Sequence, residues 1–405
     1  MSYTENYQKW LDFAELPAYL RDELVAMDEK TKEDAFYTNL EFGTAGMRGL
    51  IGAGTNRINI YVVRQATEGL AQLIDSKGDD AKKRGVAIAY DSRHFSPEFA
   101  FESAQVLAAH GIKSYVFESL RPTPELSFAV RHLHTFAGIM VTASHNPAPF
   151  NGYKVYGEDG GQMPPADADA LTDYIRAIEN PFTVQLADLE ESKASGLIEV
   201  IGENVDAEYL KEVKGVNINQ DLINEYGRDM KIVYTPLHGT GEMLARRALA
   251  QAGFEAVQVV EAQAVPDADF STVKSPNPES QAAFALAEEL GRKVDADVLV
   301  ATDPDADRLG VEIRQPDGSY LNLSGNQIGA IIAKYILEAH KTAGTLPENA
   351  ALCKSIVSTE LVTKIAESYG ATMFNVLTGF KFIGEKIHEF ETQHNHTYML
   401  GFEES

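Results

Sequence analysis

The sequence predicts an α/β fold made of three consecutive domains with mixed sheets. Strand-like and helix-like patterns alternate along most of the chain. Short apolar strands end abruptly in polar loops that contain Gly or Pro. The length of 405 residues corresponds to roughly 2.7 domains of a common size of about 150 residues. We place the domains at residues 1–203, 204–323 and 324–405.

Two features mark these boundaries. The polar stretch 180–205 is typical of a linker between a first and a second domain. Segments 309–313 and 320–323, joined through a Pro-Asp-Gly turn, predict a β-hairpin that closes the second domain. The third domain then begins near Ser324.

Three helices can be predicted from their ends or faces. One helix has Ser96 as its N-cap and Pro97 at its first position, and it ends at Gly111. Another begins at Pro278 and ends before Gly291. In a third helix, a 3-4-3 spacing of apolar residues predicts one buried face: Val63, Ala66, Leu70 and Leu73.

The composition excludes several classes of protein. Sixty acidic and 35 basic residues leave a formal net charge of −25, which argues against nonspecific binding to nucleic acid or to anionic membranes. The single cysteine, Cys353, excludes disulfide scaffolds and cysteine-ligated metal clusters. No apolar run approaches the roughly 18–20 residues of a membrane-spanning helix, and the first residues lack a signal-peptide pattern. We therefore expect a cytoplasmic protein.

Five predicted strands end in loops that carry polar and charged side chains. In open α/β sheets, ligands bind beyond the carboxyl ends of the strands, so we expect the chemistry in these loops. Because they fall in different parts of the chain, they predict one active-site cleft assembled from several domains. The strands are 86–90, 138–141, 232–234, 298–301 and 397–400, and their loops begin at Asp91, Thr142, Thr235, Thr302 and Gly401.

One of these loops carries three carboxylates at alternate positions, Asp303, Asp305 and Asp307. An extended loop can aim all three at one point, where a hard divalent cation would relieve their repulsion. Oxygen-only ligation, with no His or Cys nearby in the sequence, favours Mg²⁺ over zinc. A calcium-binding EF-hand is excluded, because Arg308 and Arg314 stand where that motif needs Gly and Glu.

A second loop, 142–147 (TASHNP), contains Ser144 and lies close in sequence to Lys154. No G-x-S-x-G motif surrounds the serine, which disfavours an acyl-transfer hydrolase. Ser144 fits the role of a phosphate acceptor beside a metal ion, and Lys154 could exchange a proton with the attacking hydroxyl. A turn serine that only bonds its own backbone is the alternative interpretation.

Two glycine-containing loops are weaker candidates for binding an anion or a nucleotide. Residues 41–49 (EFGTAGMRG) could bring amides close to an anion, with Arg48 supplying a planar fork, but they match neither common nucleotide-binding loop. Residues 238–241 (HGTG) come closer to a dinucleotide turn, yet Leu244 stands at the third glycine position. The sequence does not decide whether His238 serves only packing or has a role in the cleft.

Four motifs occur in the chain order of one enzyme family: GTAGMRG at 43–49, TASHNP at 142–147, DPDADR at 303–308 and GFEES at 401–405. In these motifs the chain resembles the α-D-phosphohexomutases over nearly its whole length. GFEES, with TGFK at 378–381, resembles the glucose-handling phosphoglucomutase branch more than the mannose-preferring one. The resemblance implies an isomerase that interconverts glucose 1-phosphate and glucose 6-phosphate through a phosphoserine and glucose 1,6-bisphosphate.

The resemblance also implies a role for each motif residue. Ser144 is the expected phosphoserine, and Lys154 the general acid or base. A phosphoserine oxygen would join the three aspartates, Asp303, Asp305 and Asp307, in holding Mg²⁺. A sugar monophosphate is the expected substrate. Arg48, His145 and Arg308 would surround the phosphoserine, and the expected substrate-binding residues are Thr378, Gly379, Lys381, Glu403, Ser405 and Arg308.

Family members continue into a fourth domain whose loop binds the distal phosphate of the substrate, whereas this sequence stops at Ser405. If that loop supplies two charge-assisted hydrogen bonds of roughly 1.5–3 kcal/mol each, their loss weakens substrate capture roughly 100- to 10,000-fold. We therefore expect this form of the protein to be weakly active or inactive.

Several alternatives stay open at this point. A phosphopentomutase, a phosphomannomutase or a sugar-bisphosphate synthase could carry nearly the same motifs. The Asp303-x-Asp305 pattern also resembles the haloacid-dehalogenase-like phosphatases, which need Thr or Val where Asp307 stands. A non-catalytic remnant that binds metal and sugar phosphate is an alternative from another class. The sequence carries no prediction of oligomeric state.

Overall fold

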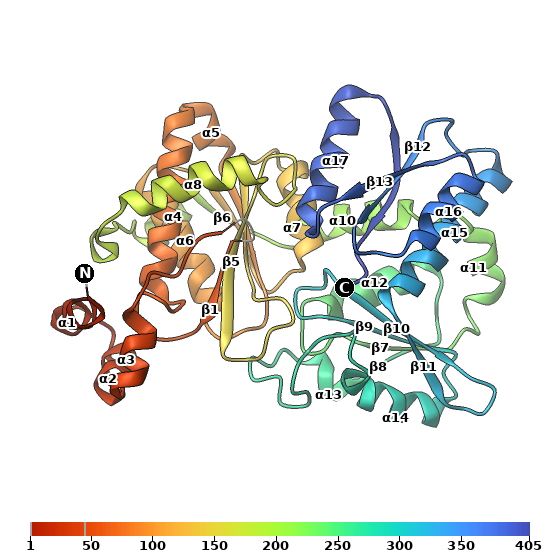
Figure 1. Cartoon of the computed structure of the whole chain (residues 1–405), viewed down its shortest axis with the longest axis horizontal. Helices are drawn as coiled ribbons and strands as arrows, with labels where there is room; N and C mark the ends of the chain where they lie inside the picture. The colour runs from red at the N-terminus through yellow and green to blue at the C-terminus, as the bar shows by residue number, and fades with distance from the viewer. Residues whose placement is uncertain (1, 44–45) are drawn as a thin grey trace. The chain divides into compact units, whose positions relative to one another are not determined.

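The computed structural model describes residues 2–43 and 46–405. The chain divides into two compact units, Met1–Gly202 and Glu203–Ser405 (Figure 1). The first unit holds one sheet and the second unit holds two, and each sheet falls within one of the predicted domains. The α/β architecture is confirmed, and the exact domain boundaries stay a prediction.

The sheet of the first unit has six strands in the order β1-β5-β4-β2-β3-β6. The strands β4, β2, β3 and β6 run parallel, whereas β5 is antiparallel to both β4 and β1, so the sheet is mixed. The strands are β1 (Met47–Leu50), β2 (Val86–Tyr90), β3 (Ser114–Phe117), β4 (Ala137–Val141), β5 (Phe150–Tyr156) and β6 (Ile198–Ile201).

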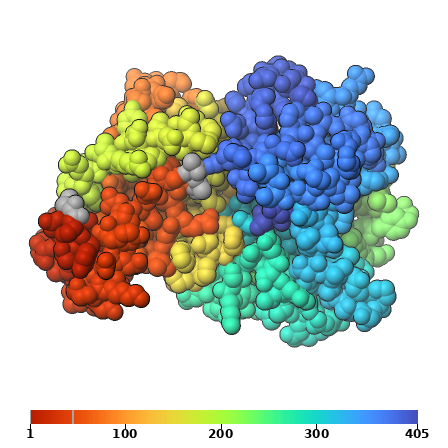
Figure 2. All heavy atoms as spheres, viewed as in Figure 1, coloured from red at the N-terminus to blue at the C-terminus, as the bar shows by residue number. Residues whose placement is uncertain are grey.

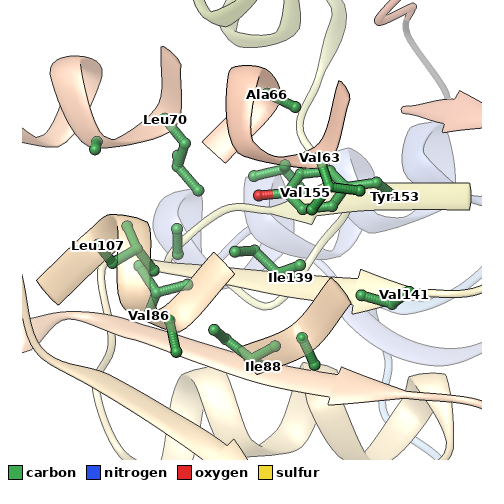
Figure 3. Close-up of a cluster of buried hydrophobic side chains, with 14 of the residues drawn as sticks. Val63, Ala66, Leu70, Val86, Ile88, Leu107, Ile139, Val141, Tyr153 and Val155 are labelled. Atoms are coloured by element: carbon green, nitrogen blue, oxygen red, sulfur yellow. The ribbon is translucent and has the colours of Figure 1, made fainter. Parts of the chain in front are cut away.

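Helices cover both faces of this sheet. On one face, α4 (Ile60–Lys77) and α6 (Ser96–Ala109) pack on alternate residues of β2 and β4, as Figure 3 shows for Ile88 and Ile139. The predicted helical face at positions 63, 66, 70 and 73 lies in α4 and is buried. On the other face, α7 (Thr123–His132) places Val130 over Gly138.

Further helices complete the first unit. The N-terminal helices enclose a small separate core around Trp10 and Phe36. The elements are α1 (Tyr3–Asp12), α2 (Ala18–Ala26), α3 (Glu29–Phe36), α5 (Asp79–Arg84), α8 (Pro165–Ala177), η1 (Pro181–Thr183) and α9 (Leu189–Ala194).

The first sheet of the second unit has the order β11-β10-β9-β7-β8. Its strands β7, β8 and β9 are parallel, and the predicted hairpin is confirmed as the antiparallel pair β10 and β11. The strands are β7 (Ile232–Thr235), β8 (Val257–Val259), β9 (Val298–Thr302), β10 (Leu309–Arg314) and β11 (Tyr320–Leu323). The helices are α10 (Glu203–Gly215), α11 (Gln220–Tyr226), α12 (Gly241–Ala252), α13 (Glu261–Ala264), η2 (Gln281–Phe284) and α14 (Ala285–Val294).

The second sheet of this unit has three parallel strands in the order β13-β12-β14. In the space-filling view, the blue atoms of residues 324–405 lie against the teal atoms that precede them in the same unit (Figure 2). The elements are β12 (Ala350–Ser355), β13 (Thr372–Val376), β14 (Thr397–Phe402), α15 (Gly325–Ala343), α16 (Glu360–Ser368) and α17 (Phe380–Gln393).

Three predicted helix ends are wrong, and tertiary contacts explain two of them. The N-cap position of α6 is held by Phe95 instead of Ser96, whose hydroxyl donates a hydrogen bond to Asp91 Oδ1 at 2.8 Å. The helix predicted from Pro278 begins only at residue 281, as η2, and then continues as α14 through Gly291. A Cβ at Gly291 would lie 2.7 Å from a methyl carbon of Leu299, so this glycine serves packing and does not end the helix.

No helix within the described ranges is long and apolar enough to cross a membrane.

Candidate active site

Ser144 lies in a buried loop that follows β4, and only 2% of its surface is exposed. Its backbone has φ +51°, a left-handed conformation that is rare for residues other than glycine. The Ser144 amide donates to Thr142 Oγ1 at 2.8 Å, and the Ser144 hydroxyl lies 3.3 Å from His145 Nδ1. Such a conformation persists only where surrounding contacts hold it, and it is common at functional sites.

The guanidinium of Arg93 supplies those contacts. Arg93 is almost fully buried, and it donates hydrogen bonds to the carbonyl oxygens of Ser144 and Asn146, both at 2.5 Å. It also donates to the carbonyl oxygens of Pro147 and Phe150, both at 3.0 Å. One side chain thus fixes both ends of the loop that carries Ser144.

Asp91 forms a buried ion pair with Arg93. Its carboxylate lies 3.1 Å from Arg93 Nε and accepts hydrogen bonds from the hydroxyls of Thr142 and Ser96 and from the amide of Arg93. Complete burial raises the pKa of Asp91, while the charge of Arg93 and the three hydrogen bonds act in the opposite direction. Asp91, Arg93 and Thr142 therefore form one buried network beneath Ser144.

The glycine-spaced loop brings Arg48 to the same edge of the sheet. Gly46 has φ +80°, and a Cβ there would collide with the carbonyl oxygen of Tyr153 on β5. Arg48 follows on β1, where its guanidinium donates to the side-chain oxygen of Asn146 at 3.1 Å. Thr44 and Ala45 of this motif lie outside the described residues.

Lys154 lies on β5 opposite Met140 of β4 and is 8% exposed. The first unit thus brings Ser144, His145 and Arg48 together through direct contacts or through Asn146. Lys154 lies on β5, the strand that follows the serine loop and pairs with both β4 and β1.

The second unit holds the three aspartates. Asp303 and Asp305 are fully buried and Asp307 is partly exposed, and each offers an oxygen within 4.8 Å of the others. The loop turns at Ala306 with φ +53°, and Asp303 Oδ1 accepts from the amide of Arg308 at 3.2 Å. Buried carboxylates that converge in this way need a compensating positive charge, so these residues could hold a divalent metal ion.

The loop at 238–241 packs behind the aspartates and does not form a dinucleotide turn. A Cβ on Gly239 would collide with Pro304, and the amide of Thr240 donates to the carbonyl oxygen of Pro304 at 2.8 Å. His238 is buried, with its ring nitrogens at 2.9 Å from the carbonyl oxygen of Val265 and at 2.8 Å from Thr272 Oγ1. The structure thus favours packing for His238.

Contacts in the second unit join four of the predicted substrate-binding residues in two pairs, Gly379 with Glu403 and Arg308 with Ser405. The amide of Gly379 donates to Glu403 Oε1 at 2.6 Å, which joins loop 378–381 to the GFEES loop. Partial burial lowers the pKa of Lys381. The Glu279 carboxylate lies 3.5 Å from Arg308 and accepts a hydrogen bond from the Ser405 hydroxyl at 3.3 Å.

Sequence analysis did not predict Asp91, Arg93 or Glu279 as site residues. Asp91 and Arg93 begin a loop that the strand-end rule did mark, but their types alone indicate no role. Glu279 contacts Arg308 and Ser405, which are distant in the sequence, and no local pattern reveals such contacts.

Three segments of the chain are similar to the domains of a known enzyme family. Residues 39–182, 207–316 and 324–405 match the models of phosphoglucomutase/phosphomannomutase alpha/beta/alpha domains I, II and III, respectively. A phosphoglucomutase of Staphylococcus epidermidis is 39% identical over 397 residues, which cover 98% of this chain and 70% of the relative. A phosphoglucomutase of Staphylococcus saprophyticus is 38% identical over 386 residues, which cover 95% and 68%.

A solved structure shares the fold. It is the open form of parafusin, a phosphoglucomutase from Paramecium, which superposes with a TM-score of 0.67 at 21% identity. The superposition covers 91% of this chain and 66% of the Paramecium chain.

Proposed function

Because the chain belongs to the phosphoglucomutase/phosphomannomutase family, we propose that it interconverts glucose 1-phosphate and glucose 6-phosphate through a phosphorylated Ser144. The observation that carries this proposal is the fixed position of Ser144. Its loop is held by the buried Arg93, and Arg48 bonds the same loop through Asn146. A fixed nucleophile beside a cation is what phosphoryl transfer requires, since that catalysis consists mainly of positioning and charge neutralisation.

In the proposed reaction, phosphate moves from Ser144 to the sugar and back. The 6-hydroxyl of glucose 1-phosphate attacks the phosphorus, a new P–O bond to the sugar forms, and the bond from phosphorus to Ser144 Oγ breaks. Lys154 takes the proton of the attacking hydroxyl and donates it to Ser144 Oγ. After glucose 1,6-bisphosphate turns around in the site, Ser144 takes the phosphate from carbon 1 in the same way, which leaves glucose 6-phosphate.

The second unit supplies the remaining groups in this proposal. Asp303, Asp305 and Asp307 would hold Mg²⁺, and a phosphoserine oxygen would complete its ligands. Convergent, mostly buried carboxylates suit this hard cation, which neutralises phosphate oxygens when bound. The other residues act on the substrate: His145 and Arg308 with the phosphate, and Thr378, Gly379, Lys381, Glu403 and Ser405 with the sugar.

The direct test is incubation of the protein with glucose 1,6-bisphosphate and Mg²⁺, followed by phosphopeptide mass spectrometry. We expect one phosphate on Ser144 in the wild type and none in Ser144→Ala. Ser92→Ala is the matched control, because the Ser92 hydroxyl has no hydrogen-bond partner within the described structure, and it should be labelled like the wild type. Phosphate on another residue, or none at all, would overturn the proposal.

The sugar preference needs a second measurement. The phosphorylated protein is mixed with glucose 1-phosphate, mannose 1-phosphate or ribose 1-phosphate, and loss of phosphate from Ser144 is followed over time. The proposal expects glucose 1-phosphate to remove the phosphate fastest. Faster removal by mannose 1-phosphate or ribose 1-phosphate would identify a phosphomannomutase or a phosphopentomutase instead.

A further inference from the structure

Glu404 lies between two residues that we assign to sugar binding, Glu403 and Ser405, but its own carboxylate has other partners. Glu404 Oε2 accepts a hydrogen bond from Ser358 Oγ at 2.6 Å and one from Ser355 Oγ at 3.0 Å. The two serine hydroxyls lie 2.7 Å apart. The middle residue of the loop therefore bonds to side chains of the turn that follows β12, away from the partners of Glu403 and Ser405.

The two serines are themselves held in place. Ser355 ends β12 and is fully buried, and the amide of Ser358 donates to the carbonyl oxygen of Ser355 at 3.1 Å, which closes a tight turn. Beneath this turn, the fully buried ammonium of Lys354 donates to the carbonyl oxygen of Ser358 at 3.0 Å and to Glu360 Oε1 at 2.9 Å. The turn that presents both hydroxyls thus has a fixed shape.

The backbone of Glu404 is also confined. A Cβ on Gly325, at the start of α15, would collide with the carbonyl oxygen of Glu404, so the loop rests directly on this helix. One residue earlier, Glu403 Oε1 accepts from the amide of Gly379. These contacts leave the loop 403–405 little freedom to change its shape.

The Glu404 carboxylate is ionised at neutral pH. Partial burial by itself raises the pKa of Glu404, but the hydrogen bonds from Ser358 and Ser355 and the nearby charge of Lys354 outweigh it, and the net pKa lies below the ordinary value. Hydrogen bonds to an ionised acceptor are stronger than those between neutral groups. Both serine contacts are therefore of the stronger kind.

We propose that Glu404, Ser355 and Ser358 form a clamp that holds loop 403–405 in the shape that binds the sugar. In this clamp they are positioning residues and touch neither the sugar nor the transferred phosphate. The inference rests on the proposed function, because it takes Glu403 and Ser405 as the sugar-binding residues. A loop that is fixed before binding has less conformational entropy to lose on binding, so the clamp should affect the affinity for the sugar phosphate and not the chemical step.

The test compares the wild type with Ser355→Ala/Ser358→Ala and Glu404→Gln in a single turnover. Each protein is phosphorylated on Ser144, and the rate of phosphate transfer to glucose 1-phosphate is measured over a range of sugar concentrations. We expect the double variant to need about tenfold more sugar for half-maximal rate, because the loss of one hydrogen bond weakens binding by about that factor. Its maximal rate should be unchanged. Glu404→Gln, which keeps the shape of the side chain, should show a smaller shift in the same direction.

Ser368→Ala is the matched control, because among the residues described the Ser368 hydroxyl bonds only the carbonyl oxygen of Ile365, in its own helix. It should behave like the wild type. Amide hydrogen exchange of peptides that cover residues 402–405 gives an independent readout, and protection there should fall in the double variant but not in the control.

The outcomes separate this inference from the proposed function. If the wild type transfers phosphate to the sugar but the double variant has an unchanged half-maximal concentration, the clamp is wrong and the proposed function stands. If the maximal rate falls instead, Glu404 acts on the chemical step, which also contradicts the clamp. If the wild type transfers nothing to the sugar, the proposed function fails, and a sugar-positioning role for the clamp fails with it.

Discussion

The guanidinium of Arg93 donates a hydrogen bond of 2.5 Å to the carbonyl oxygen of Ser144. It also donates to three further carbonyl oxygens nearby in the sequence, and its Nε lies 3.1 Å from the carboxylate of Asp91. Arg93 therefore determines the conformation of the loop without being the reacting group. This relationship leads to the first of four predictions.

Arg93→Lys should slow phosphorylation of Ser144 by glucose 1,6-bisphosphate by about 100-fold. A lysine keeps the positive charge but not the planar fork, so it cannot bond four carbonyl oxygens at once. Buried groups left unsatisfied should lower the free energy of unfolding by roughly 2–4 kcal/mol. The initial rate is measured by quantitative phosphopeptide mass spectrometry on folded protein.

The control for Arg93→Lys is Arg84→Lys, which changes a more exposed arginine that also bonds backbone carbonyls. Its phosphorylation rate should match that of the wild type. An unaffected rate in Arg93→Lys would show that the loop keeps its shape without the guanidinium.

Mg²⁺ should raise the melting temperature of the wild type but not that of Asp305→Asn. At 100 times its dissociation constant, a ligand adds about 2.7 kcal/mol of stability, which corresponds to a shift of several degrees. In EDTA, the variant should be at least as stable as the wild type, because one of three converging negative charges is gone. Melting curves in both buffers test this.

Asp317→Asn is the matched control for the metal site, since Asp317 lies in an exposed turn and bonds only Ser319 in the described structure. It should keep the full response to Mg²⁺. If Mg²⁺ still raises the melting temperature of Asp305→Asn, the ion binds at another site.

His110 should stabilise the first unit below pH 9. Hydrogen bonds to Glu68 first and Asp75 second raise the pKa of His110 from 6.5 to about 9. Because the folded pKa is raised, the stabilisation is complete below pH 6.5 and is lost as the pH rises through 9. His110→Gln should therefore cost about 2–3 kcal/mol at pH 6 and much less at pH 10.

Urea unfolding at pH 6, 8 and 10 measures this difference, with the exposed His388→Gln as control. A stability difference between wild type and His110→Gln that does not change with pH would contradict the assignment.

Glu312 should destabilise the second unit at neutral and alkaline pH, where its buried carboxyl must ionise. Its carboxyl is fully buried on β10 and accepts a hydrogen bond from Asn322 at 3.2 Å. The charge of Glu288 acts to raise its pKa, and that of Arg292 acts to lower it. Burial raises the pKa of Glu312 from 4.5 to about 7. The unfolded chain loses this proton first, so stability falls as the pH rises from 4.5 to 7.

Glu312→Gln should remove this fall, and the variant should be more stable than the wild type at pH 8 but not at pH 4.5. Thermal unfolding at the two pH values tests it, and the exposed Glu348→Gln serves as control. A variant less stable than the wild type at pH 8 would show that the ionised carboxylate is stabilised in the fold.

The part of the fold that could be predicted depends on local patterns. The five strands and the buried face of α4 follow from apolar spacing alone. Two of the three wrong helix ends depend on contacts between distant residues. Ser96 bonds Asp91 across the loop, and Gly291 makes room for Leu299, and neither fact is encoded within a few residues of the helix end.

In the candidate site, too, only residues with a local sequence signal could be predicted. Residues that carry a recognisable chemical group, such as Ser144 and Asp305, could be named from their motifs. Residues that act by position could not, because Arg93 and Glu404 gain their roles only when the chain brings carbonyl oxygens or serine hydroxyls to them. A single sequence contains no signal for such contacts.

The central claim is that phosphate moves between Ser144 and the sugar. The most direct measurement mixes protein phosphorylated on Ser144 with glucose 6-phosphate and Mg²⁺ and quantifies both products. The account predicts one molecule of glucose 1,6-bisphosphate for each phosphate lost from Ser144. Release of the phosphate as inorganic phosphate, at the same rate with and without the sugar, would contradict it.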